Sequence, residues 1–242
     1  LLLPASLIFA AAGVAIGDAI YHKKSKVFMF ISTSIVLLIT FAIQYLISLR
    51  LFEVDFIRDS LALMKTSYME SIKMTESLTG QPVPKETMDL ANTMLNTLEM
   101  TIPASITFAM LFLTFIIITV NLPILKRLKV DVPKFAKFSE LRLPRSVLWY
   151  YLIALSVNLF VRPEAGSSLA IIMLNISMVL WVLLTIQGIS FIHFVIDAFG
   201  YPKFIKVLST ILAIPLYSFV ILVGIVDLGF NARSYIREKS QK

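Results

Sequence analysis

The sequence predicts an all-α protein, a polytopic transmembrane helical bundle of about six membrane segments with an amphipathic helical hairpin outside the membrane. Hydrophobic residues make up 58% of the 242 residues, against about 45–50% in soluble domains. Charged residues make up only 15%, against about 25% in soluble domains. This composition leaves too little polar surface for a water-soluble protein of this size. The chain has no cysteine, which excludes disulfides and thiol chemistry.

Six apolar stretches account for the membrane segments, because a helix needs about 20 mostly apolar residues to cross a bilayer. In the fifth stretch, Gly188 offers a place for the helix to bend. In the last stretch, Pro215 lacks a backbone donor, so that stretch either crosses the membrane or bends into a re-entrant hairpin. Gly13-x₃-Gly17 in the first stretch predicts a face for close helix packing. The stretches are residues 1–20, 27–49, 102–120, 147–161, 168–196 and 207–226.

These stretches divide the chain into three parts. Residues 1–49 form two membrane helices, and residues 50–99 form a polar segment. Residues 100–242 form the remaining membrane helices, with a basic loop at 122–146. Because residue 1 is Leu and lies inside an apolar run, we expect further membrane helices to precede it.

The orientation follows from the lysines and arginines of the loops, which favour the cytoplasmic side. Residues 22–26 carry three lysines and no acidic residue, and residues 122–146 carry seven basic and two acidic residues. Residues 50–99 carry five basic and eight acidic residues. We therefore predict that the two basic loops are cytoplasmic and that residues 50–99 are extracytoplasmic. Two placements of the basic C-terminal tail stay open. The lysines and arginines of the tail favour the cytoplasm, which requires that the last stretch does not cross, whereas a crossing stretch would put the tail outside.

The extracytoplasmic segment is predicted to form two helices. Apolar side chains recur at spacings of three and four over residues 57–72, and a similar pattern follows over residues 85–99. Gly80 stands where a helix commonly ends, and two prolines follow it. These signals favour an antiparallel helical hairpin that rests on the outer surface of the membrane.

The hairpin is rich in methionine, since six of the ten methionines lie between residues 64 and 100. Flexible thioethers suit adaptable apolar contacts. Two interpretations remain open. The methionines either pack within the hairpin, or they belong to a cap that binds a ligand or partner through Met64, Tyr68 and Met94.

The two histidines of the chain each have an aspartate four positions away, as Asp18 and His22 and as His193 and Asp197. Residues i and i+4 share one face of a helix, so each pair is a weak candidate for a zinc or iron ligand set. Such spacings are common by coincidence, and no further ligand motif accompanies them. We therefore expect neither a metal site nor a cofactor.

Polar residues inside apolar stretches either join helices by hydrogen bonds or serve function. Asn158 and Asn175 fall on consecutive helices, so they join those helices or line an outward-facing ligand cavity. We find no nucleophile motif and no phosphate-binding loop, and therefore expect no enzymatic activity. The net charge of +7 lies in loops beside membrane segments rather than among stacking aromatics, which argues against nucleic acid as a partner. The polar residues are Gln44, Asn158, Asn175 and Gln187, with Asp227 at the end of the last stretch.

Four short segments carry a resemblance to a known family. They are TIPAS at 101–105, ELRLPR at 140–145, Gln187-Gly188, and GIVDLGFNAR at 224–233. Together they resemble the YybS-like family of bacterial multi-pass membrane proteins, a domain of unknown function. The resemblance implies a location in the bacterial cytoplasmic membrane and a longer protein with more N-terminal helices. It also implies a distant relation to the S components of energy-coupling-factor vitamin transporters.

Two functions follow from these features. The first is an S-component-like membrane protein that binds or transports a small molecule or lipid, with the hairpin as a cap over the cavity. Its basic loop would dock a partner such as an ATPase and coupling-subunit module through Lys126, Arg127 and Lys129. The alternative is a non-transporting scaffold or regulatory subunit that anchors a partner protein through residues 122–146. In either case the lipid bilayer surrounds the chain.

Overall fold

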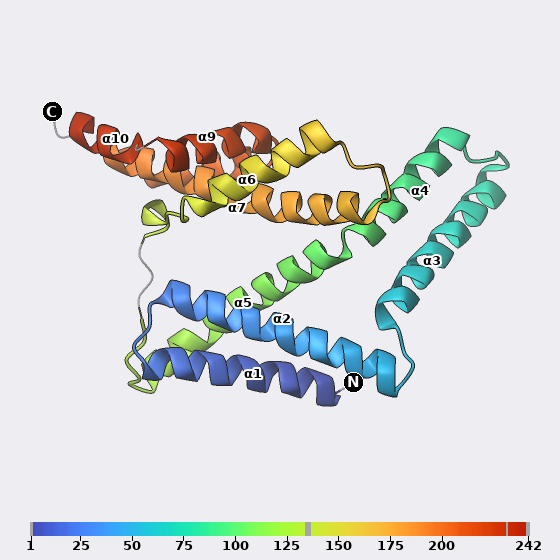
Figure 1. The fold of residues 1–242 in the computed structure, drawn as a ribbon, viewed down its shortest axis with the longest axis horizontal. Helices are drawn as coiled ribbons and strands as arrows, with labels where there is room; N and C mark the ends of the chain where they lie inside the picture. Colours follow the sequence, from blue (N-terminus) through green and yellow to red (C-terminus); the bar gives the residue numbers. More distant parts are fainter. Residues whose placement is uncertain (1, 134–136, 231, 241–242) are drawn as a thin grey trace. The chain divides into compact units, whose positions relative to one another are not determined.

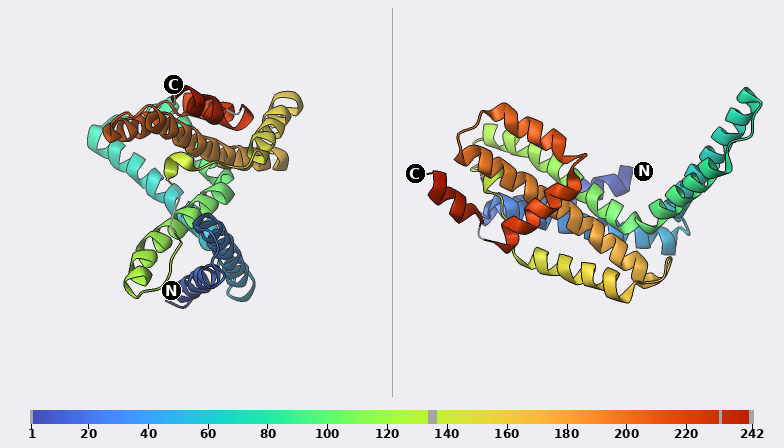
Figure 2. Two further views of the ribbon diagram at one scale, coloured as in Figure 1. Left: turned by 90° about the vertical axis from the view of Figure 1, so that its left-hand side faces the viewer. Right: turned by 90° about the horizontal axis from the view of Figure 1, so that it is seen from above.

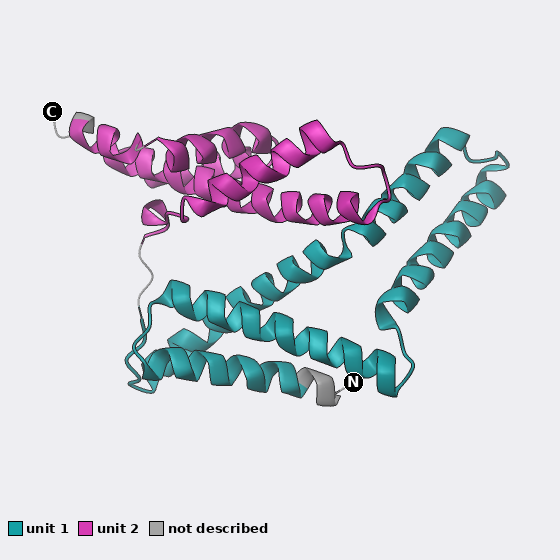
Figure 3. Cartoon of the chain, in the orientation of Figure 1, with its two compact units in different colours: residues 1–133 teal, residues 134–242 magenta. Residues whose placement is uncertain are grey.

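The regular elements of the described residues are all helices, which confirms the all-α prediction. The structure is a computed structural model that describes residues 2–133, 137–230 and 232–240. Its chain falls into two units, Leu1–Pro133 and Lys134–Lys242 (Figure 3). The division into residues 1–49, 50–99 and 100–242 concerns the membrane and stays a prediction. Unit 1 contains α1 (Leu2–Tyr21), α2 (Lys26–Leu51), α3 (Phe56–Thr79), α4 (Lys85–Met100) and α5 (Ile102–Arg127), and unit 2 contains the remaining elements.

Unit 2 begins with a short 3-10 helix, η1 (Phe138–Glu140), and ends with a polar helix, α10 (Ala232–Ser240). Between them lie α6 (Ser146–Ser156), the π-helical turn η2 (Val157–Val161), and α7 (Ser168–Ala198). The chain then forms α8 (Lys203–Ala213) and α9 (Tyr217–Gly229).

Among the described residues, three helices are long and apolar enough to cross a membrane, namely α2, α5 and α7. The pair α8 and α9 makes a fourth if the two helices form one broken span. The described apolar part of α1 and the helix of α6 with η2 are shorter than a span requires. The predicted count of about six membrane segments is therefore not confirmed, whereas the helical membrane class is.

The core of unit 1 lies where α1 and α5 pack against α2 (Figure 1). Buried Ala12 and Ile16 of α1 face this core together with Leu37 of α2. The prediction that Gly13 and Gly17 form a close packing face is wrong for the described structure. A Cβ added at either glycine would meet nothing within 4 Å, because the alanine and isoleucine side chains make the contacts of α1.

The hairpin consists of α3 and α4, which extend away from the other helices of unit 1 (Figures 1 and 2). Asp55 caps the start of α3 by accepting the backbone N–H of Arg58 at 3.0 Å. At the other end Gly80 adopts a left-handed conformation with φ +67° and donates its N–H to the carbonyl of Glu76, as the sequence predicts for a C-cap. The extracytoplasmic location of the hairpin stays a prediction.

In unit 2, α7 continues through Gly188 as one α-helix, so the expected bend at this glycine is not found. Gly188 and Gly224 instead let the backbones of α7 and α9 meet. A Cβ added at Gly188 would lie 2.1 Å from the carbonyl oxygen of Val220, and one at Gly224 would lie 2.3 Å from that of Leu184. The apolar core beside this crossing includes Leu184, Ile221, Leu228, Val147 and Ala154.

The break between α8 and α9 turns the chain by 114°, and the right-hand view of Figure 2 shows it as a sharp bend in the orange-red segment. Pro215 lies in this break, as the sequence predicts for a residue without a backbone donor. After this bend, α9 packs along α7, and its end reaches Gln187 in the second half of α7. This arrangement positions the candidate site.

Candidate functional site

A buried ion pair stands at the centre of the site. The side chain of Asp227, at the end of α9, is fully buried, and Arg233 in the first turn of α10 is 7% exposed. Arg233 donates from Nε to both carboxylate oxygens at 3.0 Å and from Nη2 to Oδ2 at 2.7 Å. Asp227 therefore holds the guanidinium plane by several charge-assisted hydrogen bonds.

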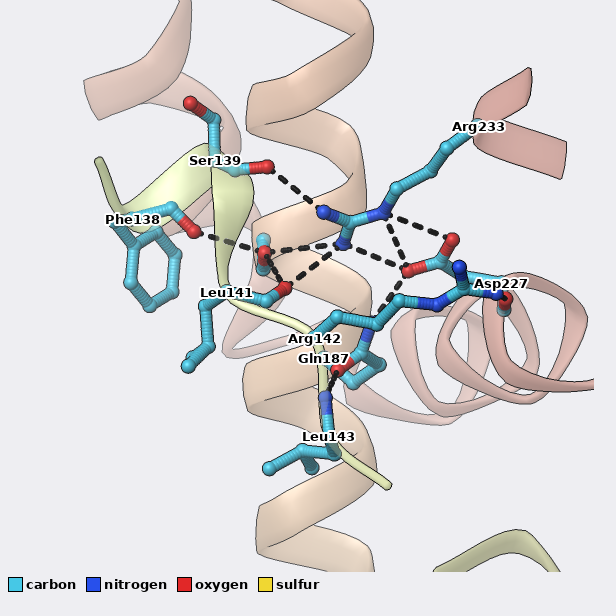
Figure 4. Close-up of polar contacts among 9 residues, drawn as sticks. Phe138, Ser139, Leu141, Arg142, Leu143, Gln187, Asp227 and Arg233 are labelled. Atoms are coloured by element: carbon cyan, nitrogen blue, oxygen red, sulfur yellow. Dashed lines mark hydrogen bonds and ion pairs between the residues drawn. The ribbon is translucent and has the colours of Figure 1, made fainter. Parts of the chain in front are cut away.

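Gln187 joins this ion pair to α7 and to the loop before α6. Its Nε2 donates to Asp227 Oδ2, and its Oε1 accepts the backbone N–H of Leu143 at 2.8 Å (Figure 4). Both ends of the buried amide are thus satisfied, which removes the cost of placing it among apolar side chains. The carboxylate, the amide and the loop backbone form one continuous chain of hydrogen bonds.

Arg233 also fixes the segment around η1. Its Nη1 donates to the carbonyl of Ser139 at 2.9 Å, and its Nη2 donates to the carbonyl of Leu141 at 3.0 Å. The hydroxyl of Ser190 lies 2.7 Å from that same Leu141 carbonyl and 3.2 Å from Arg233 Nη2. We call Ser139, Leu141, Gln187, Ser190, Asp227 and Arg233 the polar junction (Figure 4).

A pocket of about 440 Å³ lies beside the polar junction. It is bounded by the loop before α6 and by α10. Arg142 reaches across by donating to the backbone carbonyl of Asp227 at 3.4 Å, a long hydrogen bond. The lining residues are Glu140, Arg142, Arg233, Ser234 and Arg237. This pocket is strongly polar, and three of its five residues are arginines.

The two asparagines of the predicted cavity lie on the elements expected of them. Asn158 stands in the π-helical turn η2, where it donates to Ala154 of its own helix at 3.0 Å and to Ser177 of α7 at 3.4 Å. Asn175 of α7 donates to the carbonyl of Ile171 at 2.8 Å. The Asn158–Ser177 contact agrees with the interhelical hydrogen-bond interpretation. A ligand cavity at these residues stays a prediction.

The hairpin residues proposed as a cap are largely open to their surroundings. Met64 is 50% exposed and Met94 is 70% exposed, whereas Tyr68 is partly buried. The hairpin carries one ion pair between its helices, from Lys65 Nζ to Glu99 Oε2 at 3.1 Å. The exposed methionines leave an apolar surface available for a partner or ligand, which is the condition that the cap hypothesis requires.

The basic residues proposed for partner docking lie at and just beyond the end of α5. Lys126 and Arg127 occupy its last turn, where positive charge stabilises the helix dipole. Lys129 follows with φ +63°, beyond the end of the helix. All three side chains are exposed. Residues 134–136 of the predicted loop 122–146 lie outside the described residues.

The two histidine–aspartate pairs have different contacts. His22 Nδ1 lies 3.1 Å from Asp18 Oδ1, and both side chains are more than half exposed. His193 Nε2 instead contacts the Lys206 carbonyl at 3.1 Å, and Asp197 forms an ion pair with the Lys206 side chain. Across the described part of the chain, no three His, Cys, Asp or Glu side chains gather to hold a metal ion.

The polar junction is not predictable from the sequence alone. Gln187 and Asp227 stand out in the sequence as polar residues in apolar stretches, but Arg233 reads as part of a basic tail. The feature of the sequence that points to this region is the set of segments that resemble the YybS-like family. Three of its four segments, at 140–145, 187–188 and 224–233, supply residues to this one network and to its pocket.

Comparison with known families places the chain. The family model described as "Predicted membrane protein (DUF2232)" matches residues 1–228. The chain belongs to the DUF2232 family. The uncharacterized protein YybS of Bacillus subtilis (strain 168) is 27% identical over 235 residues, which cover 94% of this chain and 74% of that protein. No solved structure matches.

Membership of DUF2232 confirms the resemblance to YybS-like membrane proteins and with it a membrane protein of unknown function. The matched region includes Gln187 and Asp227 and ends before Arg233. The DUF2232 match thus contains the acidic half of the buried ion pair and the loop whose carbonyls surround the arginine.

Proposed function

We propose that this DUF2232 chain is an S-component-like subunit of the bacterial cytoplasmic membrane that binds a small molecule or lipid. The observation that carries the proposal is the buried polar junction beside an open 440 Å³ pocket. Buried charges among apolar helices are costly, and in membrane proteins they commonly mark ligand or ion sites.

The proposal assigns binding, not catalysis, to the polar junction. Its only carboxylate, Asp227, is held by Arg233 and Gln187, so it is poorly placed to act as a base. Gln187 is likewise held at both ends of its amide. These groups form a rigid frame, and the pocket beside them offers the space for a ligand.

The test is to purify the full-length protein from native membranes in mild detergent and to identify bound proteins and small molecules by mass spectrometry. A retained small molecule or lipid that raises the melting temperature supports the proposal. Stoichiometric recovery of an ATPase pair with its coupling subunit would extend it to transport. Recovery of neither a small molecule nor a specific lipid would refute ligand binding.

The second candidate is a scaffold or regulatory subunit that anchors a partner protein. The exposed methionines of α3 and α4 and the exposed basic residues around the end of α5 favour it. A variant with Met64, Tyr68 and Met94 replaced by Ala distinguishes the candidates. If the hairpin caps a ligand cavity on the outer side of the membrane, this variant loses the ligand-dependent thermal stabilisation of that cavity. Binding at the pocket beside the polar junction, which we place on the cytoplasmic side below, is then unaffected. If the chain is a scaffold, charge reversal at Lys126, Arg127 and Lys129 releases the partner instead.

We also propose that the loop at 122–146 and the C-terminal helix α10 are both cytoplasmic. Arg233 hydrogen-bonds to Ser139 and Leu141, so the start of α10 and this loop share one end of unit 2. The abundance of basic residues in the loop favours the cytoplasm for both. The pair α8 and α9 would then be re-entrant, since α7 leads toward the same end.

Single-cysteine labelling tests this topology cleanly, because the chain has no native cysteine. We expect Arg145→Cys and Glu238→Cys to react with a membrane-impermeant maleimide only after lysis. Leu78→Cys at the exposed end of α3 is expected to react on intact cells. Reaction of Glu238→Cys, but not Arg145→Cys, on intact cells would show that α8 and α9 cross the membrane.

A further inference from the structure

The pocket beside the polar junction has a distinct charge. Arg142, Arg233 and Arg237 contribute three positive charges to its lining, and Glu140 contributes one negative charge. If Asp227 is counted against Arg233, one net positive charge remains. Arg142 lies within hydrogen-bond distance of a backbone carbonyl and not of a carboxylate among the described residues. The lining therefore favours an anion.

The arginines are also held in place, which lowers the entropy lost when a ligand binds. Arg233 is fixed by Asp227 and by two loop carbonyls. The guanidinium of Arg237 lies 5.4 Å from the ring centre of Phe194, within cation–π distance. Planar guanidinium groups donate paired hydrogen bonds to the oxygens of phosphates and carboxylates, which a monatomic halide cannot accept in the same way. A phosphate group carries more acceptor oxygens than a carboxylate, so it can engage more than one arginine at once.

The position of the pocket further restricts the chemical class of the ligand. The loop that supplies Glu140 and Arg142 to the lining leads into α6, where Trp149 and Tyr150 are 64% and 58% exposed. Exposed Trp and Tyr are typical of the boundary between membrane and water, which is also where lipid phosphates lie. Basic pockets between membrane segments at this depth bind anionic head groups.

We propose that the pocket lined by Arg142, Arg233 and Arg237 binds a phosphate-bearing anion. The inference rests on the proposed binding function and names its ligand class. A lipid head group and a soluble phosphate present the same chemistry to the arginines. Arg142 and Arg237 contact the phosphate oxygens. Arg233, which its ion pair with Asp227 holds in place, forms one wall of the pocket.

The experiment uses the full-length protein in detergent, titrated separately with short-chain phosphatidylglycerol, short-chain phosphatidylcholine and inorganic phosphate. Bound copies are counted by native mass spectrometry. We expect Arg142→Gln and Arg237→Gln each to weaken binding about tenfold, as loss of one charge-assisted contact predicts. Arg145→Gln is the matched control, because Arg145 is a neighbouring exposed arginine outside the lining, and its affinity should equal that of the wild type.

The probes distinguish the two sources of phosphate. Binding of phosphatidylglycerol but not of inorganic phosphate assigns the pocket to a lipid head group. Binding of inorganic phosphate at least as tight as that of phosphatidylglycerol assigns it to a soluble phosphate. Equal effects of all three substitutions, or equal binding of phosphatidylcholine, would overturn the inference. If the protein retains another molecule from native membranes that Arg142→Gln leaves bound, the inference fails and the proposed function stands. If nothing is retained and no probe binds, both fail.

Discussion

Replacing Gly188 by Ala is expected to destabilise unit 2 by about 3 kcal/mol or more, at or above the upper end of typical overpacking costs. The added Cβ would lie 2.1 Å from the Val220 carbonyl oxygen, and backbone cannot move aside as a flexible side chain can. Either α9 separates from α7 or the helix distorts. The measurement is the fraction of monodisperse protein that remains after heating in detergent, followed by size-exclusion chromatography.

Two glycines of the partner helix α9 supply the comparison. Gly224→Ala is expected to behave like Gly188→Ala, since its Cβ would lie 2.3 Å from the Leu184 carbonyl oxygen. Gly229→Ala is the matched control on the same helix, because its Cβ would lie 3.5 Å from Leu148 Cδ2, an ordinary van der Waals contact. Similar melting temperatures for the Gly224 and Gly229 variants would show that the two helices do not approach as closely as described.

Asp227→Asn is expected to destabilise the protein by about 3–5 kcal/mol, the range observed when one partner of a buried ion pair is removed. The substitution keeps the shape of the side chain but leaves the guanidinium of Arg233 buried without a counter-charge. Thermal unfolding in detergent, monitored by circular dichroism, measures the loss. Glu99→Gln removes one partner of the exposed Lys65–Glu99 pair and serves as the control, with an expected cost below about 1 kcal/mol.

A double-mutant cycle with Arg233→Gln isolates the ion pair itself. We expect the double variant to lose less stability than the sum of the two single variants, because neither charge is then left alone. The stability of the double variant nevertheless stays below that of the wild type, because Arg233 also donates hydrogen bonds to the carbonyls of Ser139 and Leu141. Strict additivity of the two single effects would contradict the buried pair.

The helices were predictable from the sequence because local signals specify them. Ser25 accepts the N–H of Phe28 at the start of α2, and Gly80 ends α3 in the left-handed conformation that glycine favours. Pro215 likewise accounts for the break between α8 and α9. In each case one or a few neighbouring residues are enough to determine what the backbone does.

The glycine pairs show where such local signals stop. A glycine in a helix is compatible with a bend, with close packing or with neither, and only the neighbouring helix decides between them. A Cβ added at Gly188 would clash with the backbone of Val220, whereas a Cβ added at Gly13 would have no neighbour within 4 Å. The two glycines are alike in their apolar sequence surroundings, so the sequence alone did not separate them.

The polar junction required contacts between distant parts of the chain. Leu143 and Gln187 are 44 positions apart, and Gln187 and Asp227 are 40 positions apart. The polar side chains stand out in the sequence. The hydrogen bonds that join one carboxylate, one amide and one guanidinium are visible only in the structure. The resemblance segments located this region without revealing its chemistry.

The long reach of Arg233 also bears on how the protein is made. The arginine pairs with carbonyls that lie 94 and 92 positions earlier, at Ser139 and Leu141. At synthesis rates of about 5–20 residues per second, those carbonyls precede their partner by on the order of 5–20 s. Asp227 and Arg233 are only six positions apart and leave the ribosome almost together. The contacts between Arg233 and the loop can therefore form only after α8 and α9 have been synthesised, so closure of the junction is a late step in the folding of this unit.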